Sequence, residues 1–516
     1  MRDSRLRRFL GGLGLGYIQT AATIIVGLWI PPYLLRRLGS HDYGLWLLGT
    51  QVLTYLALLD LGVVALIPRE VAAAAGRAGS DRAVLRDLVA ETARLVLWQL
   101  PIVVVAGAVT VWLMPSEWAA LRWPLSIVVL TFVLTFPLRV FSAVLQGLQD
   151  LAFLGIVQIA AWASGAAVTV IGAWAGWGLI ALACGWITTQ VITAASTWRR
   201  LATNFPEVMP TQLPALTLAA AKQQLSRGVW ISFNQIAQVL LVGTDLVIVG
   251  KLLGPAAVVP YACTGRLLTM LANQPQMFMQ LALPALSELR TAATRERLFE
   301  VSRSMSQAML LLSGGIVVVV TAVNGPFVAW WVGEERFAGI GITAILLAGM
   351  LARHLNATAT YTLFCFGNER RLALTSIADG VVAALAMLIL TPMFGLYGAA
   401  VGSCLGTVAI SLPSNFRALA REAGTSPQSF LAPLVPWFVR VAAVLAAVSV
   451  VTTTWTVRGL FSFAMLAGVV SLAYLAVMLP VLSAPPLGPL LRARLAPWLA
   501  SMSAVTRAVA RVGIQS

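Results

Sequence analysis

A few charged side chains lie inside long apolar stretches of this sequence, where packing alone does not explain them. A charge at the centre of a bilayer costs about 2.5–3.5 kcal/mol on insertion scales, so such residues are functional candidates by default. An arginine guanidinium offers a planar fork of donors that suits phosphate oxygens, whereas a carboxylate suits a proton or a cation. These deep charged or titratable residues are Arg94, Arg266, Arg353, Arg440, Asp60, Asp245, Asp379 and His354.

Polar residues also recur along single helix faces. In one apolar stretch Arg227, Asn234, Gln238 and Asp245 are spaced by 7, 4 and 7 residues. At 100° per residue this spacing keeps them within roughly 40° of one another. Lipid cannot solvate such a stripe, so we expect it to face a bundle interior or a water-filled cavity. Two further stripes follow the same rule, namely Arg266, Asn273 and Gln280, and then Arg353, Asn356 and Thr360.

Each candidate also has a structural interpretation. Asn and Gln on such faces often hold membrane helices together by hydrogen bonds. Arg94 and Arg440 lie near the predicted inner side, where their side chains can extend to the headgroups. The three acids can pair with nearby arginines, or they can carry a coupling proton or cation. Arg266 and Arg353 lie deeper and have no acid within a helical turn, so we predict that they bind an anionic group, helped by Arg94 or Arg139.

The composition requires a membrane environment for the elements that position these residues. Hydrophobic residues make up 59% of the 516, charged residues only 10%, and the mean hydropathy is +0.87. Soluble domains carry about 25% charged residues. A membrane span needs about 20 mostly apolar residues, and the chain offers fourteen such stretches. They are 11–34, 43–66, 90–113, 124–146, 152–174, 178–197, 227–250, 257–283, 305–326, 338–365, 372–391, 395–414, 431–454 and 459–481.

The distribution of positive charge predicts how the chain crosses the membrane. Of 35 Lys and Arg residues, only six fall in the segments that alternation places outside. The positive-inside rule therefore puts both termini in the cytoplasm, with the stretch after Arg8 read as an uncleaved first helix. We expect a multi-pass protein of the cytoplasmic (inner) membrane that meets anionic lipid, not nucleic acid, with its basic loops. The six outer cations are Arg36, Arg37, Arg122, Lys251, Arg336 and Arg458.

Motifs for covalent, metal or nucleotide chemistry are absent from the sequence. It has no GxxxxGK[ST] phosphate-binding loop, no CxxC pair and only two histidines, so we expect no metal, no cofactor and no disulfide. The longest loops, near 67–89 and 198–226, are too short for a soluble catalytic domain. A membrane enzyme stays as an alternative, but its outer loops offer few acids. We therefore predict that the protein is not an enzyme.

An internal repeat indicates how the spans are grouped. Residues 36–46 match 251–261 at an offset of 215, and residues 147–160 match 367–380 at an offset of 220. The second offset also pairs Gly178 with Gly398. Two parallel six-helix copies are typical of transporters whose bundles rock around a site between them. The predicted parts are an N-lobe (1–197), a cytoplasmic linker (198–226), a C-lobe (227–414), two appended spans (415–482) and a basic cytoplasmic tail (483–516).

Several segments resemble one known group of membrane proteins. The runs YGLWLL…LALLDLG (43–62), TDLVIVGKLLGPAAVVPYA (244–262), LPALSEL (283–289) and FGNERRLALTSIADG…LTPMFGLYGAAVGS (366–403) are similar to the polysaccharide-transport branch of the MOP superfamily. The resemblance implies two six-helix lobes around a cavity that opens to either side in turn. It also implies flipping of a polyprenyl-pyrophosphate-linked oligosaccharide for O-antigen, capsule or exopolysaccharide assembly, with other assembly proteins as partners.

The predicted function is therefore that of a lipid-linked oligosaccharide flippase. Arg266 and Arg353 would neutralise the pyrophosphate, and a proton or sodium gradient would drive the cycle. Two alternatives keep the fold, namely a cation-coupled multidrug exporter and a peptidoglycan-precursor flippase; the second is disfavoured because the core of the first helix has no arginine. The residues predicted to hydrate the sugar are Asn234, Gln238, Asn273, Gln280 and Asn356, and the predicted ion-coupling residues are Asp60, Asp245 and Asp379.

Overall fold

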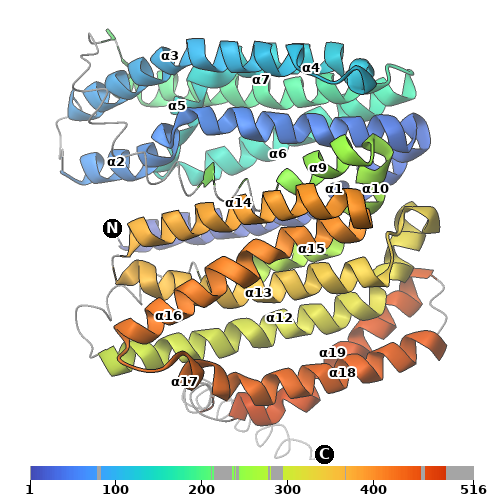
Figure 1. Cartoon of the computed structure of the whole chain (residues 1–516). Helices are drawn as coiled ribbons and strands as arrows, with labels where there is room; N and C mark the ends of the chain where they lie inside the picture. Colours follow the sequence, from blue (N-terminus) through green and yellow to red (C-terminus); the bar gives the residue numbers. More distant parts are fainter. Residues whose placement is uncertain are drawn as a thin grey trace, which may run out of the picture. The chain divides into compact units, whose positions relative to one another are not determined.

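The structure is a computed structural model that describes residues 2–77, 83–210, 243–276, 295–366, 368–454 and 459–483, with isolated positions between these ranges. Every regular element in these ranges is a helix (Figure 1). This follows from the composition, because a backbone in hydrocarbon must satisfy its own hydrogen bonds. The predicted all-α polytopic fold is confirmed.

The described residues contain fewer membrane-spanning helices than the fourteen predicted. Ten helices in the described ranges are long and apolar enough to cross a membrane, and a helix pair bent by 55° makes up to eleven. These ten coincide with predicted spans three to six and nine to fourteen. The predicted spans seven and eight lie partly outside the described residues, so the total of fourteen stays a prediction.

The chain forms two compact units, residues 1–263 with 383–402, and residues 264–382 with 403–516. The predicted lobe, linker and tail boundaries stay predictions. The first unit contains α1 (Arg2–Ala57), α2 (Val63–Arg77), α3 (Ala83–Trp112), α4 (Ala119–Thr135), α5 (Arg139–Gly147), α6 (Leu151–Trp174), α7 (Leu179–Asn204), α9 (Thr244–Leu252) and α10 (Pro255–Thr264).

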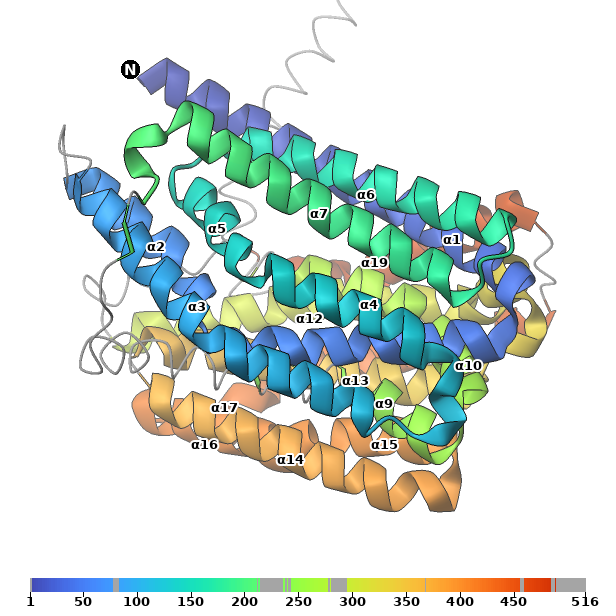
Figure 2. The same cartoon turned by 90° about the horizontal axis from the view of Figure 1, so that it is seen from above.

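Helix α1 consists of two arms joined at Gly39. This residue has φ 78° and ψ 171°, which breaks the helix, and a positive φ is readily adopted only by glycine. Figures 1 and 2 both show the chain turning at this bend, with the second arm returning toward the side from which the first arm came, so the arms correspond to the first two predicted spans. Gly254, paired with Gly39 by the repeat, also has a positive φ of 88° and precedes the start of α10.

Helices α6 and α7 pack side by side at very short range (Figures 1 and 2). A Cβ atom on Gly165 would lie 2.5 Å from the carbonyl oxygen of Gly185, and one on Gly185 would lie 2.6 Å from that of Gly165. Thr189 Oγ1 crosses the contact to the Ala161 carbonyl oxygen at 3.3 Å. Small residues with a hydroxyl bridge are typical of helix contacts in membranes, where hydrophobic burial gives no drive.

The second unit is built on a core between α12 and the last two helices. Tyr474 of α19 donates its hydroxyl to the Leu311 carbonyl oxygen of α12 at 2.7 Å, and its ring lies against Gly314 together with Trp437 of α18. Phe416 and Phe430 meet edge to face at 5.0 Å. The helices of this unit are α12 (Arg295–Val332), α13 (Ile340–Cys365), α14 (Glu369–Phe394), α15 (Leu396–Gly406), α16 (Leu412–Glu422), α17 (Pro427–Leu431), α18 (Val435–Thr454) and α19 (Gly459–Ser483), although the α14–α15 hairpin at 383–402 belongs to the first unit.

Candidate functional site

A buried carboxylate in the second unit lies against a local irregularity of the helix. Asp379 of α14 is 2% exposed, and its Oδ1 and Oδ2 accept from Thr407 Oγ1 at 3.3 and 3.1 Å. Ser411 is a second side-chain partner. Thr407 and Ser411 are the first and last residues of a π-helical segment that joins α15 to α16. Such segments occur frequently at functional sites.

The lack of a side chain at Gly406 allows α14 to lie close to the start of the π-helical segment. A Cβ atom on Gly406, directly before the π-helical segment, would lie 2.1 Å from the Asp379 carbonyl oxygen and 2.4 Å from its Oδ1. The same is true one helix away, where a Cβ atom on Gly349 of α13 would lie 2.2 Å from Cys404 Sγ. The backbone thus positions Asp379 within reach of both hydroxyl groups.

Arg353 adds a positive charge to this site. It lies in α13, is half-buried, and directs Nη1 to the Ser403 carbonyl oxygen at 3.5 Å. Its charge also acts on Asp379 at longer range. A single long hydrogen bond to a carbonyl leaves the other guanidinium donors able to take an anion.

The polar stripe predicted on α13 continues from Arg353 toward α16. Asn415 of α16 donates through Nδ2 to Asn356 Oδ1 at 2.9 Å and to Thr360 Oγ1 at 3.4 Å. The same Asn415 accepts through Oδ1 from Arg371 at 3.4 Å. We call this set the second-unit site, defined by Arg353, Asn356, Asp379, Thr407 and Asn415.

The first unit holds a second buried carboxylate, at the break between α1 and α2. Asp60 is 3% exposed, and its Oδ2 lies 3.4 Å from Arg139 Nη2. Its Oδ1 accepts from the Gly62 backbone at 2.9 Å, and Gln99 of α3 donates to its carbonyl oxygen at 3.1 Å. Leu61 and Gly62 have φ of 50° and 71°, which ends the helix. We call Asp60, Gln99 and Arg139 the first-unit site.

The Asp60–Arg139 pair joins two helix irregularities. Arg139 begins α5 directly after a 3-10 turn, Phe136–Leu138, that separates α4 from α5. Pro137 inside this turn lacks an amide hydrogen and favours the break. Arg139 was predicted to help bind an anion. In the structure one of its guanidinium nitrogens, Nη2, already lies against the Asp60 carboxylate.

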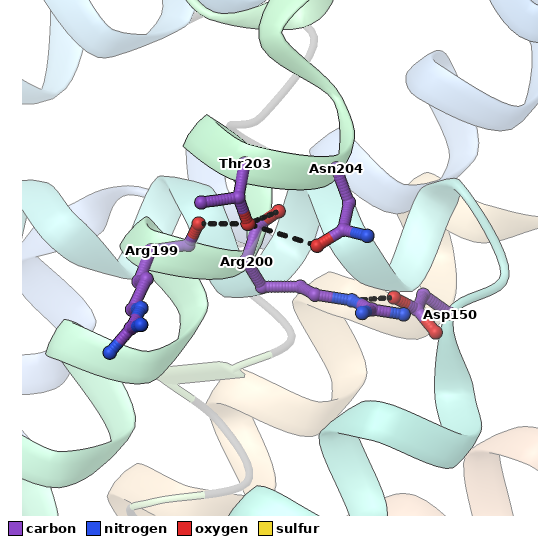
Figure 3. Close-up of polar contacts among 5 residues, drawn as sticks. All are labelled: Asp150, Arg199, Arg200, Thr203 and Asn204. Carbon is purple, nitrogen blue, oxygen red and sulfur yellow. Dashed lines mark hydrogen bonds and ion pairs between the residues drawn. The ribbon is translucent and has the colours of Figure 1, made fainter.

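A separate ion pair fastens the ends of α6 and α7. Arg200 Nε lies 2.8 Å from Asp150 Oδ2, directly before α6 (Figure 3), and the guanidinium covers the Phe153 ring at 4.7 Å. Thr203 Oγ1 donates back to the Arg199 carbonyl oxygen at 2.9 Å. Figure 3 shows the Arg199 side chain pointing away from Asp150, so the two adjacent arginines have different roles.

The remaining predicted site residues are dispersed. Arg94 and Arg266 are half-buried, and Asn273 is exposed. Asp245 is half-buried near the start of α9, where its Oδ1 accepts from the Leu246 backbone at 2.8 Å. Arg440 is half-buried and donates to the Pro436 carbonyl oxygen at 3.1 Å, one turn back along α18. Asn234, Gln238 and Gln280 lie outside the described residues.

Sequence reasoning missed a buried hydroxyl ladder on the opposite face of α13. Ser302 meets Thr362 at 2.8 Å and Ser306 meets Thr358 at 2.9 Å. His354, which is 1% exposed, continues the ladder through Nδ1 to Ser313 Oγ at 2.7 Å. The ladder joins α12 to α13 as helix packing. The sequence feature that could have revealed the ladder is the spacing of Ser and Thr by three or four residues in both helices.

Comparisons with known proteins agree with this architecture. A family model described as a polysaccharide biosynthesis protein matches residues 96–336. No curated protein sequence matches the chain. A structure of the lipid II flippase MurJ in an inward closed conformation superposes with a TM-score of 0.63 at 9% identity, over 91% of this chain and 100% of that chain.

Two multidrug transporter structures show the same architecture. An inward-facing MATE transporter of the MOP superfamily has a TM-score of 0.56 at 13% identity, over 81% of this chain and 99% of that chain. The MATE multidrug transporter DinF-BH has a TM-score of 0.51 at 13% identity, over 80% of this chain and 92% of that chain. The chain is thus a multi-pass membrane protein with the fold of the MOP superfamily, and the resemblance predicted from its sequence is confirmed.

Proposed function

We propose that this chain is a flippase that moves a polyprenyl-pyrophosphate-linked oligosaccharide across the cytoplasmic membrane by alternating access, for assembly of a surface polysaccharide. The observation that carries the proposal is the match of residues 96–336 to a polysaccharide biosynthesis family in a chain whose fold is similar to that of a lipid flippase. Both termini would lie in the cytoplasm, and the partners would be the lipid-linked glycan and other polysaccharide-assembly proteins.

Arg353 would bind the pyrophosphate. Its guanidinium is held by one carbonyl oxygen at 3.5 Å within an apolar helix bundle, where few other groups can neutralise an anion. Arginine binds phosphate oxygens with two parallel hydrogen bonds, which lysine cannot match. Asn356 and Asn415, already joined at 2.9 Å, would exchange that hydrogen bond for the hydroxyl groups of the glycan. Arg266 would contribute a second charge.

Asp379 would couple transport to a proton or a sodium ion. Its two oxygens already face hydroxyl donors from the π-helical segment, and loss or gain of a charge there changes how strongly Arg353 holds an anion. A ligand shifts a conformational equilibrium only by its differential affinity for the two states. A cation bound beside Asp379 in one state would supply that difference.

Membrane lipid analysis of a deletion strain tests the proposal. We expect one polyprenyl-linked oligosaccharide to accumulate when the gene is removed, as measured by mass spectrometry, and to disappear when the wild-type gene returns. Arg353→Ala should fail to complement, and Arg353→Lys should complement poorly. Arg440→Ala, which removes a half-buried arginine of α18 outside the second-unit site, is the matched control and should complement fully. An unchanged lipid profile in the deletion strain contradicts the proposal.

A cation-coupled multidrug exporter is the second candidate function. It is supported by the shared fold with MATE transporters and by the two buried carboxylates, Asp60 and Asp379. In that case the deletion strain would keep its lipid profile and gain sensitivity to cationic dyes, and Asp379→Asn would reproduce this sensitivity. Accumulation of a peptidoglycan precursor instead would indicate the third, less favoured cargo.

A further inference from the structure

Four arginines lie near the start of α14 and the end of α16. Figure 1 shows these two helix ends on the same side of the picture. Arg370 and Arg371 open α14, while Arg417 and Arg421 lie on α16. Arg371 joins the two helices, because its Nη2 donates to Ser414 Oγ at 2.8 Å and also to the Ser414 carbonyl oxygen. Ser414, Arg417 and Arg421 follow one another at three and four residues, so they share one face of α16. We call these four arginines the α14–α16 arginine patch.

Among the side chains that the structure describes, no carboxylate forms an ion pair with the patch. Arg421 lies near enough to Arg371 for their charges to act on each other. The neighbouring acid Glu422 accepts from Asn368 Nδ2 at 3.2 Å, which joins the end of α16 to the residue before α14. An anion from outside the chain would relieve the repulsion between these like charges.

An apolar stripe continues from the patch along α14. Leu374 and Val381, which belong to the second unit like the patch, are both exposed. At 100° per residue they lie within roughly 40° of Arg370 around the helix. The stripe begins one turn after Arg370 and runs toward the middle of the span. A molecule that follows it would place its anionic group at the arginines and its hydrocarbon along Leu374 and Val381.

We propose that the α14–α16 arginine patch binds the phosphate headgroup of an anionic membrane phospholipid, whose acyl chain lies along the α14 stripe. Basic pockets between membrane helices on the cytoplasmic side are suited to such headgroups, and a guanidinium matches phosphate geometry. The exposed face of α16 completes the site, since Phe416, Leu419 and Ala420 are buried on its other side. The assignment of the site to the cytoplasmic leaflet rests on the membrane orientation given under the proposed function. The proposal that the site binds the phospholipid does not depend on that orientation.

Native mass spectrometry of the purified full chain tests this inference. The probe is phosphatidylglycerol, with phosphatidylcholine as the neutral comparison. We expect tighter binding of phosphatidylglycerol, and a loss of roughly 20- to 30-fold in its affinity in R417Q/R421Q. The double variant R36Q/R37Q removes the same charge from two exposed arginines outside the patch and should bind as the wild type does.

Three results would overturn the inference. These are unchanged binding in R417Q/R421Q, an equal loss in R36Q/R37Q, and displacement of the lipid by millimolar inorganic pyrophosphate, which would indicate a site for free or substrate pyrophosphate. If R417Q/R421Q does not fold, the single variant R370Q carries the test, with an expected loss of about fivefold. This experiment measures lipid binding and not transport. Its result can therefore be interpreted even if the flippase proposal fails.

Discussion

The first-unit site makes a prediction about one buried ion pair. Asp60 is almost fully buried, whereas the Arg139 side chain is 34% exposed. Removing one partner of a buried pair leaves an uncompensated charge, which costs about 3–5 kcal/mol when both groups are fully buried. We expect Arg139→Gln to lower the free energy of unfolding by about 2–3 kcal/mol, less than that range because the arginine is partly exposed. Thermal unfolding in detergent measures it, and D60N/R139Q should lie closer to the wild type than R139Q does. Additive effects of the two substitutions would contradict the pairing.

Thr407 makes a second prediction at the scale of the residue. Its hydroxyl donates to both oxygens of Asp379, and a buried acceptor that loses its donor costs about 1–3 kcal/mol. Thr407→Val keeps the shape and removes the donor, so it should lower thermal stability by that amount. Thr407→Ser keeps the hydroxyl and is the control. Equal stability of the two variants would show that the hydroxyl does not support Asp379.

Sequence reasoning found the polar residues of α13 but not their partner on α16. The spacing of Arg353, Asn356 and Thr360 predicted a shared polar face, and the structure places Asn356 and Thr360 on one amide, Asn415. Asn415 was not predicted, because it lies outside the predicted twelfth span and only tertiary packing brings α16 to α13. Gln99 lies inside the predicted third span and was missed because its partner is a backbone carbonyl 39 residues away.

At the scale of the element, hydrophobic runs predict helices but not their interruptions. Ten predicted spans match described helices. The second predicted span was placed at 43–66, whereas the helix breaks at Leu61 and Gly62 and resumes as α2 up to Arg77. The reason is local: two residues with positive φ and an Asp60 carboxylate that accepts from the Gly62 amide. The repeat pairs Gly178 with Gly398, but Gly178 has φ 59° whereas the corresponding turn before α15 uses Gly395 at φ 58°.

The close contact between α6 and α7 predicts that adding one methyl group at Gly185 destabilises the protein. In Gly185→Ala the new Cβ atom would lie 1.9 Å from Thr169 Oγ1 and 2.6 Å from the Gly165 carbonyl oxygen. The backbone cannot yield without separating the helices, so we expect a loss of about 1–3 kcal/mol. Gly468→Ala in α19 is the matched control, because nothing lies within 4 Å of its Cβ position. Thermal unfolding of both variants should separate them, and equal midpoints would argue against the close contact.

At the scale of the whole molecule, aromatic residues mark the membrane interfaces, and positive charge indicates which interface is cytoplasmic. Trp112, Trp123 and Trp174 are strongly exposed at 78%, 67% and 71%. They lie at the end of α3, the start of α4 and the end of α6, at or beside the predicted outer ends of the spans. Tryptophan collects at membrane interfaces, and arginine collects on the cytoplasmic side. The charge distribution is a property of the full chain, so the orientation could be predicted from it before any contact was known.

This orientation leads to a prediction that single cysteines can test. In a chain whose four cysteines (Cys184, Cys263, Cys365 and Cys404) are replaced by serine, we introduce cysteine at exposed positions on predicted outer turns, Glu117 and Glu334, and on predicted inner turns, Asn204 and Thr425. A membrane-impermeant maleimide added to intact cells should label E117C and E334C at once. It should label N204C and T425C only after the membrane is permeabilised, because the bilayer blocks the charged reagent.

Each pair of positions samples both compact units, since Glu117 and Asn204 belong to the first and Glu334 and Thr425 to the second. Six spans is an even number, so two parallel copies must enter the membrane from the same side. Labelling that is reversed in both units would invert the predicted orientation. Labelling that is reversed in only one unit would mean that the copies are antiparallel, and the parallel repeat inferred from the sequence would then be wrong.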